Sequence, residues 1–326
     1  MEREAKRPKD FWDKLEKAST FIASVVLAAV TWGATTLITA RQAERDAALR
    51  EVEVRNAQLA TVQGFMDFLT GTPDEQDMAI LAISTLGDDS LAVRLGAVTR
   101  REEALGALLP HLARMGRAPL VRNVIESGVD PERRDPAGNT AMMVAAMTGS
   151  LEVMQELLAL GASLDAVADP TLWTPLMFGA ARGHVEVVGW LLENGAAVDT
   201  RNRNGASALW LAAQAGRTGS ARRLVEHGAS VDLADHDAWT PLIIAAANGH
   251  SPVVQLLVDS GADVDFRSTD GETALMAAAE RGSIEAVRAL LRAGASRQLQ
   301  DQDGLTAGDR ARLFGHEEIA REIDGR

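Results

Sequence analysis

The stretch from Thr240 to Asp265, TPLIIAAANGHSPVVQLLVDSGADVD, recurs along the chain without internal gaps. Copies begin at Thr140, Thr174, Ser207, Thr273 and Thr306, so successive starts, Thr240 included, lie 34, 33, 33, 33 and 33 residues apart. Units of this length and similarity share one structure and stack to bury a core that one unit cannot bury alone. The repeat therefore predicts an elongated array rather than a globule with one central core.

The residues that recur in each copy have structural reasons. Thr or Ser at the start can cap a first helix, and Pro175 and Pro241 stand in its first turn, where a missing N–H costs nothing. A Gly nine residues after each cap allows the positive φ needed to reverse the chain between antiparallel helices. These glycines are Gly149, Gly183, Gly216, Gly249, Gly282 and Gly315, and the second helices end at Gly161, Gly195, Gly228, Gly261 and Gly294.

This period and order resemble the ankyrin repeat, in which a turn precedes a helix opened by Thr-Pro-Leu-His and a second helix closed by Gly-Ala. The resemblance implies an all-α ankyrin-repeat solenoid, made of helix-turn-helix units with β-turn loops, over residues 135–326. The family His is replaced here, so we expect apolar packing instead of imidazole hydrogen bonds between loops. The replacing residues are Met143, Met177, Trp210, Ile243 and Met276.

Both ends of the array depart from the repeat pattern. Residues 102–134 resemble a degenerate capping repeat, with Ala107 at the Thr position and Gly116 and Gly128 at the two turns. The last unit, Asp301 to Ile323, resembles the opposite cap. We expect its charged residues to face water: Arg310, Arg312, Glu317, Glu318 and Arg321.

The segment before the array contains an uncharged run from Ser19 to Ala40. At about 1.5 Å per residue it reaches roughly the thickness of a hydrocarbon core, so we predict a single transmembrane helix over residues 19–40. Residues 1–18, which mix charges with Phe11 and Trp12, suit a juxtamembrane segment at the membrane surface. A cleaved signal peptide is the alternative, although the run exceeds the usual length and Ile38 suits the cleavage rule poorly.

Residues 41–72 lack Pro before the break at Gly71 and alternate in charge, so we predict a helical stalk, with only a weak heptad pattern for a coiled coil. Residues 73–101 read as a helical hairpin that turns at Gly87. A stripe of small residues in the uncharged run, including Ala29 and Gly33, would let two membrane helices approach closely, while a lone helix remains the alternative.

Composition excludes several kinds of function. The net charge is −13, which argues against a nucleic-acid partner, and the absence of Cys excludes disulfides and thiolate chemistry. No motif for nucleotide binding, metal binding or catalysis is present, so we predict no cofactor, no metal and no enzymatic activity. His184, His250 and His316 all follow the Gly between helices, which indicates a scaffold role.

The resemblance implies that the array binds a protein partner on a concave face of turns and first helices. The residues free to serve this face lie before each cap and just before the Gly between helices. They are Trp173, Arg182, Arg203, Gln214, His236, Trp239, Asn248, Glu280 and Arg281. Trp commonly precedes Thr in this family, however, and then only covers the turn.

We therefore predict a membrane-anchored protein-binding module. The alternatives are an oligomeric scaffold or sensor head assembled through the membrane helix and stalk, and an exported soluble binding protein. Six Lys and Arg precede the predicted membrane helix, and four Arg follow it closely, which favours an internal amino terminus. The familiar cytosolic setting of ankyrin repeats favours the opposite orientation.

Overall fold

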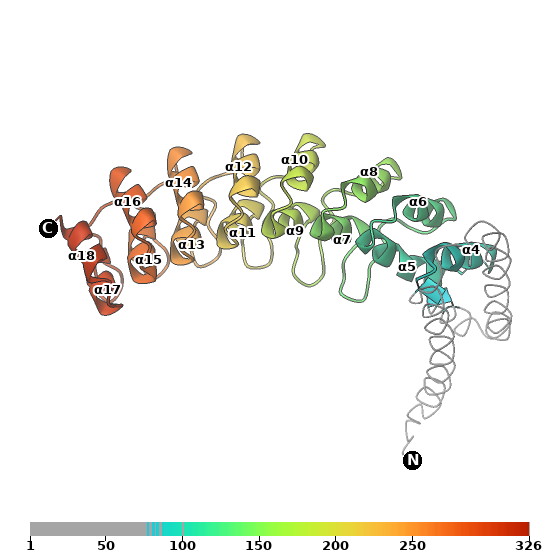
Figure 1. The fold of residues 1–326 in the computed structure, drawn as a ribbon, viewed down its shortest axis with the longest axis horizontal. Coiled ribbons are helices and arrows are strands. Elements are labelled where there is room, and N and C mark those ends of the chain that lie inside the picture. Colours follow the sequence, from blue (N-terminus) through green and yellow to red (C-terminus); the bar gives the residue numbers. More distant parts are fainter. Residues whose placement is uncertain (1–76, 78–79, 82, 85–86, 100, 326) are drawn as a thin grey trace, which may run out of the picture. The chain divides into compact units, whose positions relative to one another are not determined.

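The computed structural model describes residues 77, 80–81, 83–84, 87–99 and 101–325 (Figure 1). The segments predicted as juxtamembrane, transmembrane and stalk, residues 1–18, 19–40 and 41–72, lie outside these residues. Within the described part of the chain, no helix is long and apolar enough to span a bilayer. The chain divides at Arg101 into two units, each described by itself.

The first unit contains helix α4, Asp89–Thr99. Gly87 adopts a φ of +92° just before it, and the Asp88 carboxylate accepts a hydrogen bond from the Leu91 N–H at 2.9 Å. Arg101 forms two hydrogen bonds with Asp77, at 2.6 and 2.8 Å. The chain therefore turns at Gly87 and begins α4 at the residues expected to cap a helix.

The second unit, Glu102–Arg326, consists of helix pairs that follow one another in a row (Figure 1). We call it the repeat array. The first helices of the pairs are α5 Glu102–Arg114, α7 Ala141–Thr148, α9 Pro175–Arg182, α11 Ala208–Gln214, α13 Pro241–Ala247, α15 Ala274–Arg281 and α17 Ala307–Leu313. The second helices are α6 Ala118–Glu126, α8 Leu151–Ala159, α10 Val185–Glu193, α12 Thr218–Glu226, α14 Ser251–Asp259, α16 Ile284–Arg292 and α18 Glu317–Asp324.

Each first helix packs on the next first helix, from α5 through to α17, and the core lies between this layer and the second helices. Buried residues such as Leu176, Leu191 and Leu257 contribute to it from both layers. The described residues contain no strand, and Arg134 and Thr140 form an isolated bridge. The all-α solenoid predicted from the repeat is confirmed for the array.

The side chains predicted to cap the first helices do so in every copy. Each Thr or Ser oxygen accepts a hydrogen bond from the backbone N–H three residues later, because that N–H has no partner inside the helix. The distances range from 3.2 to 3.5 Å. The capping residues are Thr140, Thr174, Ser207, Thr240, Thr273 and Thr306.

Imidazoles join neighbouring repeats, which the sequence did not lead us to expect. The Nε2 atoms of His184, His250 and His316 lie 3.0 to 3.1 Å from backbone carbonyls at the end of the preceding first helix. Each ring sits over the Gly of that preceding repeat, where a Cβ would collide with it. The residues that replace the family His are buried, as expected, and the imidazole hydrogen bonds are made instead by His at the position after the Gly.

Arginines reinforce the same interfaces. The guanidinium groups of Arg134, Arg201 and Arg267 donate to carbonyls of the following repeat at 2.6 to 2.7 Å. These three interfaces are the ones that the His residues also join, and at the interface between the second and third repeats Arg203 and Arg217 donate to the carbonyls of Pro170 and Ala181. At every interface between regular repeats, a carboxylate accepts a hydrogen bond from a backbone N–H of the next repeat. Asp199, for example, accepts from the Ser230 N–H at 3.0 Å.

The two end units differ from their prediction. Helix α5 begins at Glu102, so Ala107 lies inside the helix and not at its cap, because Glu102 to Leu105 favour a helix, and Gly106 is accommodated within it. At the other end, the Arg310 side chain is only 17% exposed and bonds to carboxylates instead of facing water. Arg312, Glu317, Glu318 and Arg321 are exposed as expected.

Candidate partner-binding face

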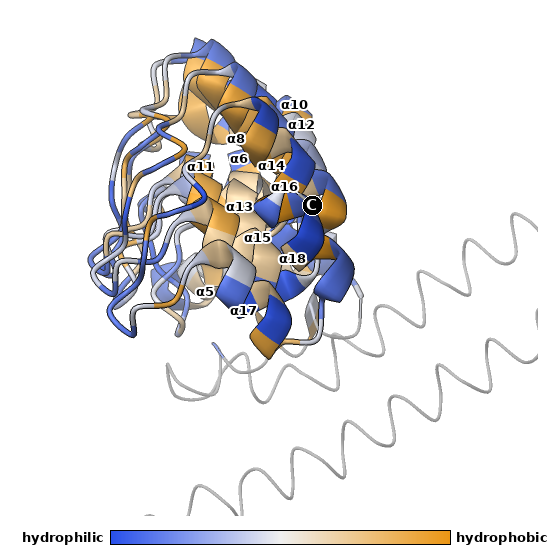
Figure 2. Ribbon diagram, turned by 90° about the vertical axis from the view of Figure 1, so that its left-hand side faces the viewer, coloured by the Kyte–Doolittle hydropathy of each residue, from blue (hydrophilic) through white to orange (hydrophobic). Residues whose placement is uncertain are grey.

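The turns and the ends of the first helices lie on one side of the repeat array, and the second helices lie on the other side (Figure 2). We call the side with the turns the binding face. Trp173, Arg203, His236 and Trp239 lie in turns. The other predicted residues lie in, or directly after, the last turn of first helices: Arg182 in α9, Gln214 in α11, Asn248 after α13, and Glu280 and Arg281 in α15.

A ladder of backbone hydrogen bonds joins the tips of successive turns. In each step, the N–H of one turn donates to a carbonyl of the preceding turn at 2.9 to 3.1 Å. The donors and acceptors are Arg203 to Thr171, His236 to Asn204, Thr269 to Asp237, and Gln302 to Asp270. The ladder joins the turns by regular backbone hydrogen bonds and so holds the binding face in one arrangement.

The ladder has a gap between the first two turns of the regular repeats. The residue that should donate there is Pro170, which has no N–H. Accordingly, the carbonyl of Ala137 has no backbone donor among the described residues. This is the one step between regular repeats at which no backbone hydrogen bond joins the turn tips of the described array, although the Arg134 side chain donates to the Val167 carbonyl nearby.

A depression of about 570 Å³ lies at this gap. Met147, Pro170, Trp173 and Phe178 form its apolar lining, and the Trp173 and Phe178 rings lie 5.0 Å apart between centroids. Its polar edge is made by Asn139, Asp169, Thr171, Arg182 and Arg217. We call it the Trp173 depression.

A second depression of about 460 Å³ lies two repeats further along, at the next turn that carries a Trp. Trp239 and the 50% exposed Phe314 contribute its aromatic surface. The Trp239 carbonyl accepts a hydrogen bond from Trp210 Nε1 at 2.9 Å, which ties this turn to the preceding helix. The rest of the lining is Ala247, Glu272, Ala277, Glu280, Arg281, Arg310 and His316, and we call this site the Trp239 depression.

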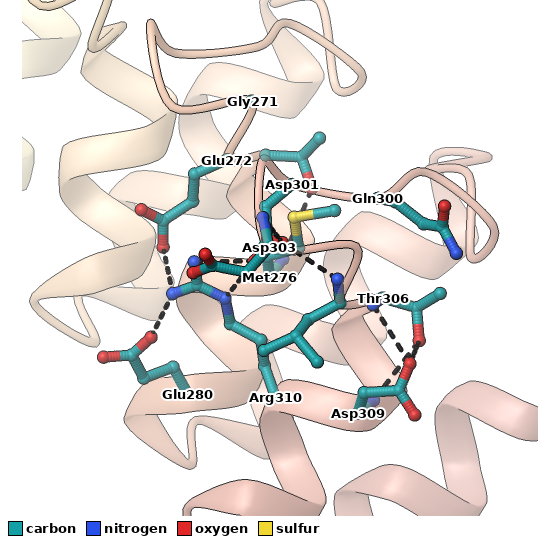
Figure 3. A network of polar contacts seen from close by, with 12 residues as sticks. Gly271, Glu272, Met276, Glu280, Gln300, Asp301, Asp303, Thr306, Asp309 and Arg310 are labelled. Atoms are coloured by element: carbon teal, nitrogen blue, oxygen red, sulfur yellow. Dashed lines mark hydrogen bonds and ion pairs between the residues drawn. The ribbon is translucent and has the colours of Figure 1, made fainter.

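Arg310 holds three carboxylates together beside the Trp239 depression (Figure 3). Its Nη1 lies 2.5 Å from Glu280 and 3.4 Å from Glu272, and its Nη2 lies 2.8 Å from Asp301. The Asp301 side chain is 1% exposed and the Glu272 side chain is 13% exposed. One buried cation therefore compensates three negative charges.

The pKa values of the two most buried carboxylates in this cluster, Asp301 and Glu272, shift in opposite directions. Burial raises the pKa of Glu272 more than the attraction of Arg310 lowers it. Burial also acts to raise the pKa of Asp301, but hydrogen bonds from the Leu305 N–H and from Arg310 outweigh it, so its pKa is lowered. The surroundings therefore favour the charged form of Asp301 and disfavour the charged form of Glu272.

The structure brings together only some of the predicted residues. Trp173 and Arg182 line one depression, and Trp239, Glu280 and Arg281 line the other. Arg203, Gln214, His236 and Asn248 line neither. The Arg203 guanidinium donates to the Pro170 carbonyl at 2.5 Å, and the Asn248 amide donates to the Ile244 carbonyl at 2.9 Å.

Several lining residues were missed from the sequence. Phe314 occupies the same repeat position as Arg182 and Arg281, so the rule that selected those residues would also have found it had the last unit not been treated only as a cap. Phe178, Arg217, Glu272 and Arg310 gave no such signal, because their roles depend on contacts with a neighbouring repeat.

The turn side of the array offers aromatic and charged lining residues. Among the residues that the structure describes, no group of His, Asp and Glu side chains is arranged to hold a metal ion. His184, His250 and His316 are engaged with backbone carbonyls, as a scaffold role predicts.

Comparison with known proteins agrees with the geometry. A family model described as ankyrin repeats (3 copies) matches residues 109–202, 194–268 and 261–323, which together cover more than half of the chain. No curated protein matches the chain significantly. Repeats of this kind are generally non-enzymatic modules for protein–protein interaction. The chain belongs to the ankyrin-repeat family.

Proposed function

We propose that the repeat array captures a protein partner on the binding face and that residues 19–40 hold it at a membrane. The observation that carries the first part is that two aromatic-lined depressions lie on the turn side of the array, each at a Trp-bearing turn. Trp and Arg are the residues most often found as anchors of protein interfaces. The second helices instead expose isolated charged residues such as Glu186 and Arg222, which solvent alone accounts for.

A photo-crosslinking amino acid placed in the full chain in its native cells identifies the partner. We expect products from positions 182 and 248, on the binding face, and none from positions 186 and 222, on the second helices. Products that join only copies of this chain would favour the oligomeric scaffold instead.

Arg182→Glu combined with Trp239→Ala should weaken binding of the crosslinked partner by at least about 2 kcal/mol, because each change alters one depression. The matched control is Glu186→Ala with Arg222→Ala, which changes as many side chains on the second helices. Affinity is measured on variants with equal melting temperatures. Equal losses in both pairs would remove the binding face as the site.

Val26→Arg should shift the chain from the membrane fraction to the soluble or degraded pool. The charge falls near the centre of the predicted span, where insertion costs roughly 2.5–3.5 kcal/mol. The measurement is recovery in carbonate-washed membranes, with Val26→Leu as the control. Full recovery of the Arg variant would contradict a membrane-spanning role for residues 19–40.

A further inference from the structure

We propose that the Trp173 depression binds an apolar side chain of a partner segment whose flanking residues are acidic. This inference rests on the proposed function and assigns the chemistry of one site within it. Three observations carry it: the gap in the turn ladder, an exposed Leu in an unfavourable backbone conformation, and a local excess of positive charge on an acidic protein.

The gap makes this place different from every later step of the ladder. Because Pro170 cannot donate, the Ala137 carbonyl has no backbone partner among the described residues, and residues of both turns line the depression. A peptide segment lying here meets apolar rings from Trp173 and Phe178 and an open carbonyl at the edge. Such a surface suits a segment that inserts one side chain and donates a backbone N–H.

Leu172, beside the depression, stands at a turn position where every regular repeat has a positive φ. Its φ is +60°, a value that costs free energy for any residue with a Cβ, and the side chain is 38% exposed. The matching positions in the other turns are occupied by Gly138, Gly205, Gly271 and Gly304, which adopt positive φ without that cost, and by Ala238, whose φ is +58°. Among these positions, Leu172 carries the largest side chain, and its exposed surface next to Trp173 adds apolar area that a partner side chain can cover.

The charges around the depression favour an acidic partner. Arg203 and Arg217 donate to the carbonyls of Pro170 and Ala181, and Arg182 has no ion-pair partner within the described array. None of these guanidinium groups is neutralised by a carboxylate, and Asp169 is the acidic residue in the lining. The chain as a whole carries a net charge of −13, so this local excess of positive charge is distinctive.

The charges that line the Trp239 depression largely cancel. There Glu272 and Glu280 stand beside Arg281 and Arg310, and Arg310 is already shared among three carboxylates. The Trp239 depression therefore lacks the excess of positive charge found at the Trp173 depression, so the charge pattern predicts that an acidic segment enters the Trp173 depression.

A displayed library of random twelve-residue peptides, selected on the detergent-solubilised full chain, tests the inference. We expect enriched peptides to carry an apolar residue flanked by Asp or Glu. Their affinity should fall at least tenfold in Trp173→Ala and in Arg182→Glu with Arg217→Glu, and change less than twofold in Trp239→Ala. When the library is selected again on the variant that carries both Arg182→Glu and Arg217→Glu, Lys or Arg should be enriched at the flanking positions.

Leu172→Gly separates binding from folding. Removing the strained side chain should raise the melting temperature while it weakens the selected peptides several-fold, a combination that a purely structural role would not produce. Unchanged peptide affinity in a stabilised Leu172→Gly variant would count against the contact with Leu172.

The other outcomes are decisive as well. Three results would overturn this inference: enriched peptides with basic flanks, peptides sensitive only to Trp239→Ala, or no enrichment. None of them would contradict the proposed function, which the crosslinking experiment tests separately. Peptides insensitive to both Trp variants, yet lost in Glu186→Ala with Arg222→Ala, would overturn both.

Discussion

Gly216→Ala is expected to destabilise the repeat array by about 2–4 kcal/mol. Gly216 has a φ of +66°, which costs about 1 kcal/mol for a residue with a Cβ. The new Cβ would also lie 2.7 Å from Nδ1 of His250, whose Nε2 is held by the Gln214 carbonyl. Because the ring cannot move without losing that contact, overpacking adds about 1–3 kcal/mol.

Gly228→Ala is the matched control. Gly228 also has a positive φ, +82°, but no atom lies within 4 Å of the position of its Cβ. It should therefore cost only about 1 kcal/mol. Urea unfolding of the full chain, followed by tryptophan fluorescence, gives both values.

The His250→Ala background isolates the contribution of the ring. There, Gly216→Ala should cost no more than Gly228→Ala, because the contact that separates the two glycines has been removed. Equal effects of the two glycine changes in the unmodified protein would show that the packing of His250 over Gly216 does not constrain this turn.

Gly249→Val should destabilise the array less than Gly216→Val, since its Cβ meets the flexible Arg281 side chain at 3.3 Å.

Arg310→Met should destabilise the carboxyl-terminal repeats by about 2–4 kcal/mol at pH 7. The change leaves the carboxylate of Asp301, 1% exposed, and that of Glu272, 13% exposed, without their shared cation. An uncompensated buried charge costs more than the ion pair contributed. Hydrogen exchange of α15 to α18 locates the loss, and urea unfolding measures its size.

Arg288→Met is the control, since Arg288 also pairs across neighbouring repeats, with Glu322 at 2.8 Å. Those side chains are 47% and 32% exposed, so the pair is screened by water and its loss should cost much less than the loss of Arg310. Similar losses for the two variants would mean that Arg310 contributes no more than a surface ion pair.

The effect of Arg310→Met should depend on pH. In the unmodified protein, the lowered pKa of Asp301 contributes stability above its unfolded value of 3.8, and this stability is lost as the pH falls through the folded value. The raised pKa of Glu272 has the opposite sign: its contribution is present below 4.5 and is lost as the pH rises through the folded value. Without Arg310 both pKa values rise, so the deficit of the variant should shrink between about pH 7 and pH 4. A deficit that stays constant would exclude uncompensated charge as its cause.

The local features of the fold could be predicted from the sequence. The caps from Thr140 to Thr306 and the glycines nine residues later act on backbone groups within a few residues of themselves, so their spacing was sufficient to predict them. The start of α5 was wrong because a degenerate unit was aligned to the regular pattern, whereas its first residues simply extend the helix.

Only part of the candidate site could be predicted from the sequence. The repeat register placed Trp173, Arg182, Trp239 and Arg281 on one face, because equivalent positions in stacked repeats share a side. It did not show which of them share a depression, nor that Arg203 and Asn248 are engaged with the backbone.

The sequence by itself determined the repeat, its family, the helix limits of the regular copies and which residues share the turn side of the array, since all of these follow from periodicity and local backbone chemistry. Only the tertiary structure decided which side chains meet across repeats. The His250 ring over Gly216, the carboxylates around Arg310 and the depression beside Pro170 each join residues about one repeat apart, and such contacts depend on the stacking distance and on the direction of each side chain.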